Sequence, residues 1–155
     1  MSGLLRFACL LGLAVWIGGV VCFSFIVAPA IFGVLGAARA GDVVGVIFPR
    51  YYAVGAGAAA TAVACALGLA RRAERPARWR VAAIVMGIGL AVMVWAGAVV
   101  APRAGRLRAT LAAVGEEPGA NAEFRRLHAA AVVLNGVALV AGVLGLGLSA
   151  AALRE

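Results

Sequence analysis

The chain has 155 residues, of which 65% are hydrophobic and 13% are charged, and its mean hydropathy is +1.07. A soluble domain of this length presents charged groups over most of its surface, so this composition excludes one. The apolar residues fall in blocks of about 20, the length that crosses a hydrocarbon core as an α-helix. The alternating segments of about 10 residues that a membrane β-barrel needs are missing. We therefore expect an integral membrane protein.

The formal net charge is +8, and all 14 basic side chains are arginines that lie almost wholly in the breaks between apolar blocks. Arginines at helix ends contact lipid headgroups, so the charge indicates the bilayer as a partner and no nucleic acid. The three cysteines lie inside apolar blocks without CxxC or His-paired spacing. No disulfide framework, zinc site or cofactor is therefore indicated.

Four transmembrane helices are expected at approximately residues 4–27, 50–70, 81–101 and 124–151. They form one domain, an all-α four-helix transmembrane bundle over residues 1–155. Pro29 and Pro102 are expected to end the first and third helices and Pro49 to open the second, because proline lacks an N–H group. Asp42 is expected to cap a short interfacial helix.

The segment 71–80 is the clearest turn, with five arginines, one tryptophan and one proline in ten residues. Four helices place both termini on the side of this turn. The arginines divide equally between the two sides of the membrane, seven on each. We expect the 71–80 side to be cytoplasmic, in a multi-pass protein of the cytoplasmic membrane, because the positive-inside bias is most reliable in short loops.

The sequence contains signs of an internal repeat. Val27-Ala28-Pro29 is followed 73 residues later by Val100-Ala101-Pro102, and Phe48 is followed 76 residues later by Phe124. This spacing predicts two tandem hairpins that enter the membrane in the same direction. The alternative is that these residue types are common at helix ends.

Small and polar residues recur at heptad spacing in the fourth helix, and a shorter stripe lies in the second. Small stripes allow close helix approach in lipid, so these residues are expected to pack against other helices. The same stripe would pair the chain with a second copy or another membrane protein. The predicted packing residues are Gly57, Thr61, Ala131, Ala138, Gly142, Gly145 and Ser149.

Polar residues gather where the second and fourth helices enter the membrane. His128 and Asn135 lie two turns apart on one helix face, and Arg50, Tyr51 and Tyr52 start the other helix on the same side. Polar groups in a bilayer are costly, which makes these five residues the candidate binding site. The alternative is that Asn135 bonds across a helix interface while His128 and the tyrosines lie among headgroups.

Met86 and Met93 lie seven residues apart on one face of the third helix. Together with His128 they offer soft ligands for a metal ion such as Cu(I), although thioethers are also ordinary core residues. The sequence has no paired carboxylates, Ser/His/Asp set or phosphate loop, so an enzyme is not expected.

Several motifs together resemble one known family. They are Trp16-Ile17-Gly18-Gly19, Val27-Ala28-Pro29, Phe48-Pro49-Arg50-Tyr51-Tyr52, and His128 with Asn135. This ordered set resembles the transmembrane protein 205-like family, small four-helix membrane proteins of unsettled function, and the fold is similar to the copper-resistance D-type membrane domain. The resemblance implies a four-helix fold and, through relatives associated with tolerance of platinum drugs, a link to metals.

Two functions follow from these features. The first is handling or export of a metal ion or small solute at the polar residues of the second and fourth helices. The alternative is a non-catalytic assembly module that pairs through the small face of the fourth helix.

Overall fold

The computed structural model describes residues 2–114 and 118–154, and this part of the chain is helical and contains no strand. Its elements are α1 (Ser2–Cys22), the π-helix η1 (Phe23–Val27), α2 (Ala28–Ala70), α3 (Pro76–Trp95), the π-helix η2 (Ala96–Val100), α4 (Ala101–Val114) and α5 (Pro118–Ala152). Four stretches are long and apolar enough to span a membrane: Gly3–Gly36, Arg39–Ala70, Pro76–Leu111 and Ala122–Ala152. The expected all-α four-helix membrane bundle is confirmed.

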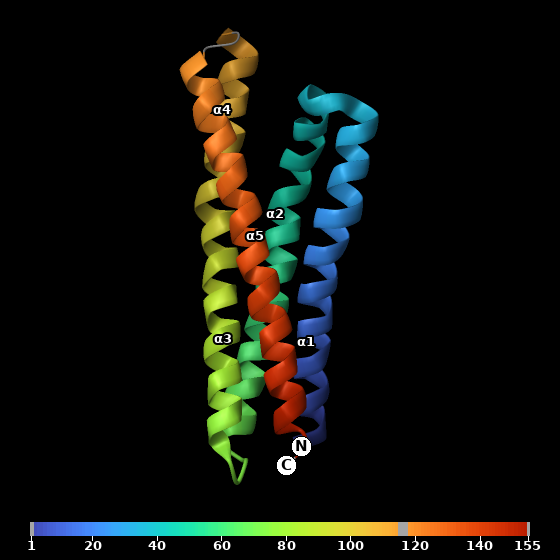
Figure 1. The fold of residues 1–155 in the computed structure, drawn as a ribbon, viewed down its shortest axis with the longest axis vertical. Coiled ribbons are helices and arrows are strands. Elements are labelled where there is room, and N and C mark those ends of the chain that lie inside the picture. Colours follow the sequence, from blue (N-terminus) through green and yellow to red (C-terminus); the bar gives the residue numbers. More distant parts are fainter. Residues whose placement is uncertain (1, 115–117, 155) are drawn as a thin grey trace.

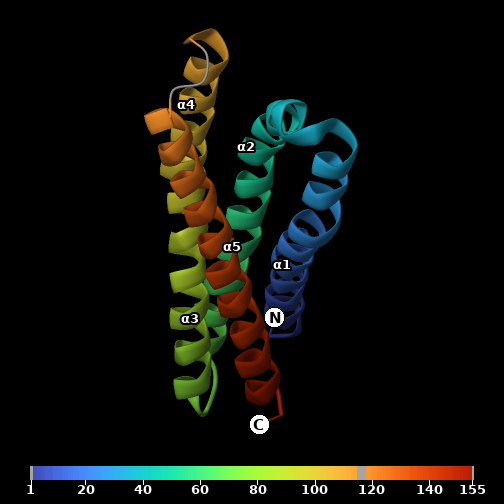
Figure 2. The same cartoon turned by 45° about the horizontal axis from the view of Figure 1, so that its top comes forward.

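The bundle consists of two hairpins side by side (Figure 1). The first contains α1, η1 and α2, and the second contains α3, η2, α4 and α5. Both termini lie at the same end as the turn between α2 and α3, which we call the terminal end; the opposite end is the tip end. At the tip end, α4 and the start of α5 extend beyond the turn of the first hairpin (Figure 2). Which end faces the cytoplasm stays a prediction.

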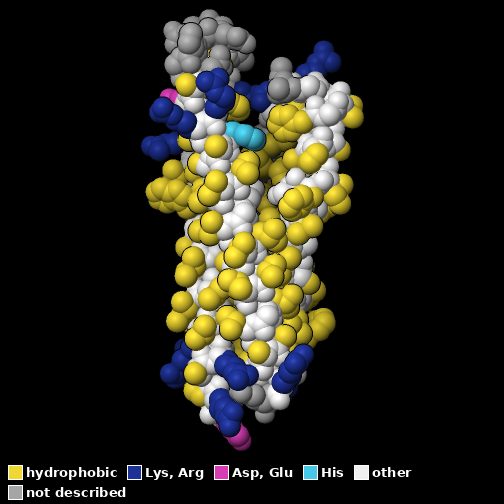
Figure 3. Space-filling model, viewed as in Figure 1, with side chains coloured by type: hydrophobic (Ala, Val, Ile, Leu, Met, Phe, Trp, Pro, Cys, Tyr) yellow, Lys and Arg dark blue, Asp and Glu magenta, His cyan; other side chains and the backbone are white. Residues whose placement is uncertain are grey.

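The outer surface suits a bilayer. Apolar side chains cover the middle of the bundle, and arginines gather at both ends (Figure 3). Large apolar side chains point outward from the spans, for example Phe25 at 68% exposure and Val54 at 61%. Lipid tails solvate such a surface and headgroups pair with arginines at its edges. The chain is thus a multi-pass integral membrane protein.

The first and third helices do not end at Pro29 and Pro102, so that expectation was wrong. Each proline instead follows a π-helix. In η1 the Ala28 N–H donates to the carbonyl of Phe23, five residues earlier, and η2 repeats this bond 73 residues later. The wider turn accommodates the proline ring and its missing N–H, so the helix continues.

The second and fourth helices begin earlier than predicted. The chain turns at Gly36, whose φ of 70° is natural for glycine, and the second span starts at Arg39. Pro49 therefore lies inside α2 instead of opening it. The fourth helix starts at Pro118 rather than near residue 124, because proline fits the first turn of a helix.

Asp42 also lies inside the helical stretch, so it does not cap a separate interfacial helix. Its carboxylate accepts a hydrogen bond from Nε of Arg108 in α4 at 3.2 Å. The Arg108 guanidinium lies directly over Gly41, where a Cβ would collide with it. This contact joins the two hairpins at the tip end.

The buried residues of the two hairpins coincide at the spacing of the Ala-Pro pairs. Those of the first arms are Cys9, Leu13, Trp16, Val20 and Phe23 in one hairpin and Ala82, Met86, Gly89, Met93 and Ala96, each 73 residues later, in the other. Trp16 packs on its own counterpart, since a Cβ at Gly89 would lie 2.5 Å from the indole ring. Equivalent residues touch only near an axis that relates them, which supports two parallel hairpins about a pseudo-two-fold along the bundle.

Candidate functional site

Two of the predicted site residues meet between the hairpins. The Tyr51 hydroxyl in α2 donates to Oδ1 of Asn135 in α5 at 3.3 Å, and both side chains are half-buried. Tyr52 follows with only 4% of its surface exposed. Hydrogen bonds between membrane helices contribute about 0.6 kcal/mol on average, so this bond positions the tyrosine more than it stabilises the fold.

Two phenylalanines complete a four-ring cluster around the tyrosines. The ring centroids of Phe23 and Tyr51 are 4.8 Å apart, those of Tyr51 and Tyr52 are 5.0 Å apart, and those of Phe48 and Tyr52 are 5.6 Å apart. All three pairs are tilted or edge-on, the geometry that aromatic quadrupoles favour. The tyrosine rings are therefore held by neighbours from two elements.

Both π-helices abut this cluster. Phe23 is the first residue of η1, and Gly97 lies in η2, where a Cβ would stand 2.7 Å from Cβ of Tyr52. One π-helix thus supplies a ring and the other supplies the room for one. π-Helices recur at functional sites because the extra residue in the turn redirects side chains.

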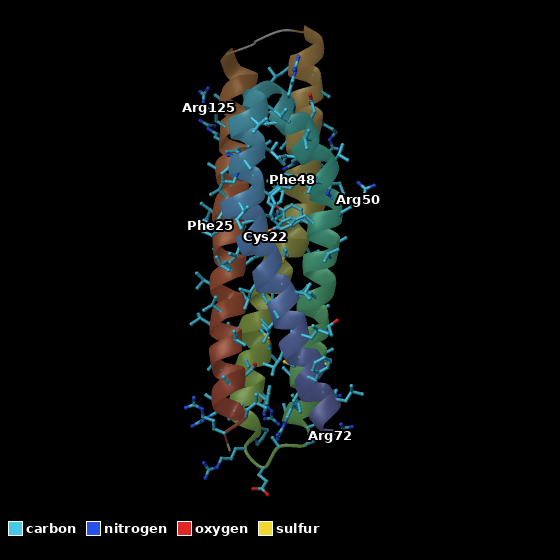
Figure 4. All side chains as sticks on the ribbon, turned by 90° about the vertical axis from the view of Figure 1, so that its right-hand side faces the viewer. Cys22, Phe25, Phe48, Arg50, Arg72 and Arg125 are labelled. Carbon is cyan, nitrogen blue, oxygen red and sulfur yellow. The ribbon has the colours of Figure 1, made fainter. Side chains whose placement is uncertain are left out.

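A cleft of about 320 Å³ lies between α1 and α2, beside the tyrosines. It is lined by Val15, Trp16, Gly19, Val20, Val46, Ile47, Arg50, Tyr51, Val54, Gly55 and Met93. This volume is at the lower end for small-molecule sites. Arg50 is exposed, donates to the Val46 carbonyl at 3.2 Å and projects outward from α2 (Figure 4), so its charge stands at the rim of the cleft.

Two buried polar atoms at this site lack a hydrogen-bond partner among the described residues, Nε1 of Trp16 and the hydroxyl of Tyr52. An unpaired buried donor costs about 1–3 kcal/mol. Trp16 lines the cleft and Tyr52 belongs to the ring cluster, so both costs are concentrated at the candidate site.

The predicted metal ligands are not brought together. His128 is exposed on α5 and lies on the outer surface (Figure 3), whereas Met86 and Met93 are fully buried. Met86 packs on Gly145, which is 17 residues from His128 and so about 25 Å away along the helix. In the described part of the chain, no group of three or more His, Cys, Asp or Glu side chains is placed to hold a metal ion.

The small face of the fourth helix packs within the chain. Its buried members are Ala138, Gly142, Gly145 and Ser149. Gly142 lies under Ile17, and Gly145 lies under Met86. Ala131 is half-buried. Gly57 and Thr61 are exposed on α2, where the Thr61 hydroxyl donates to the Gly57 carbonyl at 2.9 Å, and these two do not pack on another helix.

Sequence reasoning did not assign Phe23 and Gly97 to the site. The signal that marks both is the pair of Ala-Pro dipeptides at equal spacing, because each proline places a π-helix just before it.

Comparison with known protein families matches residues 11–113 to a family described as Domain of unknown function (DUF4149). This match covers about two thirds of the chain and includes the cleft, Arg50 and both tyrosines, whereas Asn135 and His128 lie beyond it. Comparisons with curated proteins and with solved structures give no match. The chain therefore belongs to the DUF4149 family of uncharacterised membrane proteins.

Proposed function

We propose that this chain is a non-enzymatic membrane protein that binds a small solute in the cleft between α1 and α2 and handles it there. The observation that carries this proposal is the cleft itself, which combines apolar walls with Arg50 at its rim and the Asn135-held Tyr51 at its side. Apolar pockets with a few fixed polar groups are the usual form of a small-molecule site.

The lining supports binding rather than catalysis. None of the eleven residues around the cleft, all in the described part of the chain, is a carboxylate, histidine, serine or cysteine. General acid–base or nucleophilic catalysis needs such a group within hydrogen-bond reach of the substrate. Arg50 and Tyr51 instead have the capacity to bind and orient.

The other candidate functions have less support. Metal handling, which the resemblance to the transmembrane protein 205-like family suggests, needs ligands close together, and His128 is far from Met86 along the bundle. Assembly through the small face of the fourth helix needs that face free, and Gly142 and Gly145 are covered inside the chain.

Native mass spectrometry of detergent-purified protein tests the proposal. We expect a bound small molecule that Gly19→Leu removes, because Gly19 lines the cleft and a Cβ there meets no atom within 4 Å, so the larger side chain fills the cleft without a clash. Gly18→Leu is the matched control, since Gly18 has equally open surroundings but lies outside the lining.

Absence of any adduct, or an adduct that survives Gly19→Leu, would overturn the proposal. Metal analysis of the same sample addresses the competing function, because stoichiometric bound metal would favour metal handling instead.

A further inference from the structure

The spacing of arginines along the helices gives the depth of the cleft in the membrane. Arg50 and Arg71 are 21 residues apart on α2, about 31 Å, which matches a hydrocarbon core of about 30 Å. Arg80 and Arg103 are 23 residues apart along the second hairpin, about 35 Å. Both pairs bracket the hydrocarbon, so Arg50 lies at headgroup level on the tip side.

The cleft begins at this level and runs into the hydrocarbon. On α2 its lining extends from Val46 to Gly55, nine residues or about 14 Å along the helix, close to the depth of one leaflet. Val15, Val46 and Val54 line it and also keep exposed surface. The cleft is therefore open sideways to the bilayer, and its occupant enters from lipid.

We propose that the cleft binds an anionic phospholipid, with one acyl chain between α1 and α2 and the phosphate on Arg50. This inference rests on the proposed function and names its solute. An acyl chain fits walls that are apolar from Val15 to Gly55, and its headgroup then meets the one cation that lines the cleft.

The chemistry of Arg50 favours this headgroup. A guanidinium has five N–H donors, and the Val46 carbonyl accepts from one of its nitrogens, which leaves donors for phosphate oxygens. A zwitterionic lipid carries a phosphate too, but its choline cation is repelled by the same arginine. An anionic headgroup lacks that repulsion, so the cleft discriminates between the two.

Trp16 provides a local probe because it lines the cleft. The full-length chain with Trp79→Phe and Trp95→Phe is reconstituted into phosphatidylcholine vesicles that contain, at equal mole fraction, phosphatidylglycerol or phosphatidylcholine with brominated chains. Bromine quenches indole fluorescence on contact. We expect brominated phosphatidylglycerol to occupy the site about fivefold more readily than brominated phosphatidylcholine, the effect of one arginine near an anionic surface.

Two variants separate the headgroup from the chain. Arg50→Gln removes the preference for phosphatidylglycerol, whereas Gly19→Leu lowers quenching by both lipids and Gly18→Leu leaves it unchanged. Because Trp79 is buried and its replacement risks misfolding, the same series in a chain that retains Trp79 gives the signal of Trp16 as the difference between Gly18→Leu and Gly19→Leu.

Equal quenching by both lipids, or quenching that Gly19→Leu does not change, would overturn the phospholipid assignment. If native mass spectrometry then shows a different adduct that depends on Gly19, the solute is another molecule and the proposed function stands. If it shows no adduct, the proposed function fails as well.

Discussion

The two hairpins share a scaffold and differ in what they place on it. In each, a π-helix just before a proline bends the first arm, and the same buried positions recur. The first hairpin places rings at Trp16 and Phe23, where the second has Gly89 and Ala96. Rings on one side and gaps on the other let the hairpins interlock. The shared positions thus set the fold, and the unequal positions build the site.

The grooves between the arms show the same difference. The groove between α3 and α5 is lined by Val85, Ile88, Val133, Gly136, Val137, Val140, Ala141 and Leu144, which offer no polar side chain. At the repeat spacing of 76 residues, Arg50 corresponds to Arg126 but Tyr51 corresponds to Leu127. The charge recurs and the hydroxyl does not, which places the binding function in the first hairpin.

The largest expected effect comes from making the axis positions equal in size. Gly89→Leu drives a side chain into the Trp16 ring and toward Ala141, whose Cβ would lie 2.9 Å from the new Cβ. Neighbours on both sides prevent relief, so we expect a loss of about 3 kcal/mol in the free energy of unfolding. Reversible unfolding in mixed micelles of dodecyl sulfate and a mild detergent measures it.

Gly87→Leu is the control on the same helix, since a Cβ there meets nothing within 4 Å, and its change should stay within about 0.5 kcal/mol. The pseudo-two-fold predicts more: the exchanged pair Trp16→Gly with Gly89→Trp should recover most of the stability that Gly89→Trp alone loses. A double variant no better than the sum of the two single losses would contradict the equivalence of these positions.

The amino-acid pattern was sufficient for the class and the pairing of helices. Apolar blocks between arginines predicted the four spans, and the Ala-Pro pairs predicted two hairpins in the same direction. The helix ends were beyond it, because a proline inside a membrane helix either ends the helix or widens one turn. Which occurs depends on whether neighbours such as Tyr52 make room for the wider turn.

The site was predictable in part for a similar reason. Tyr51 and Asn135 are costly in lipid unless paired, so their types alone indicated an interaction. His128 has the same polarity but lies on an exposed face, and the sequence does not determine which way its ring points. The cleft depends on how far α1 and α2 diverge, and that divergence follows from the bend at η1.

A smaller effect is expected where the first hairpin reaches the second through one hydroxyl. Tyr51→Phe leaves Asn135 without its donor and should cost about 0.6–1 kcal/mol of unfolding free energy. Tyr52→Phe removes a buried hydroxyl that has no partner among the described residues, so it should be neutral or stabilising. Unfolding in mixed micelles compares the two, and a double-mutant cycle with Asn135→Ala isolates the bond. A larger cost for Tyr52→Phe would show that Tyr52, not Tyr51, is the partner of Asn135.

The smallest effect concerns the contact between the hairpins at the tip end. Asp42 is 77% exposed and Arg108 is 23% exposed, so solvent screens the pair and Asp42→Asn should cost no more than about 0.5 kcal/mol. The loss should disappear in 1 M salt, where the screening length falls to about 3 Å. Thermal unfolding at low and high salt measures it, with Arg106→Gln on α4 as a control for net charge.

Arg108→Gln separates charge from packing at the same contact. The Arg108 guanidinium also covers Gly41, so its removal takes away van der Waals contact that salt does not screen. We therefore expect part of the loss in Arg108→Gln to persist in high salt, whereas that of Asp42→Asn does not. If both losses vanish together, the hairpins are held at this end by charge alone, and their alignment rests on the axis contact between Trp16 and Gly89.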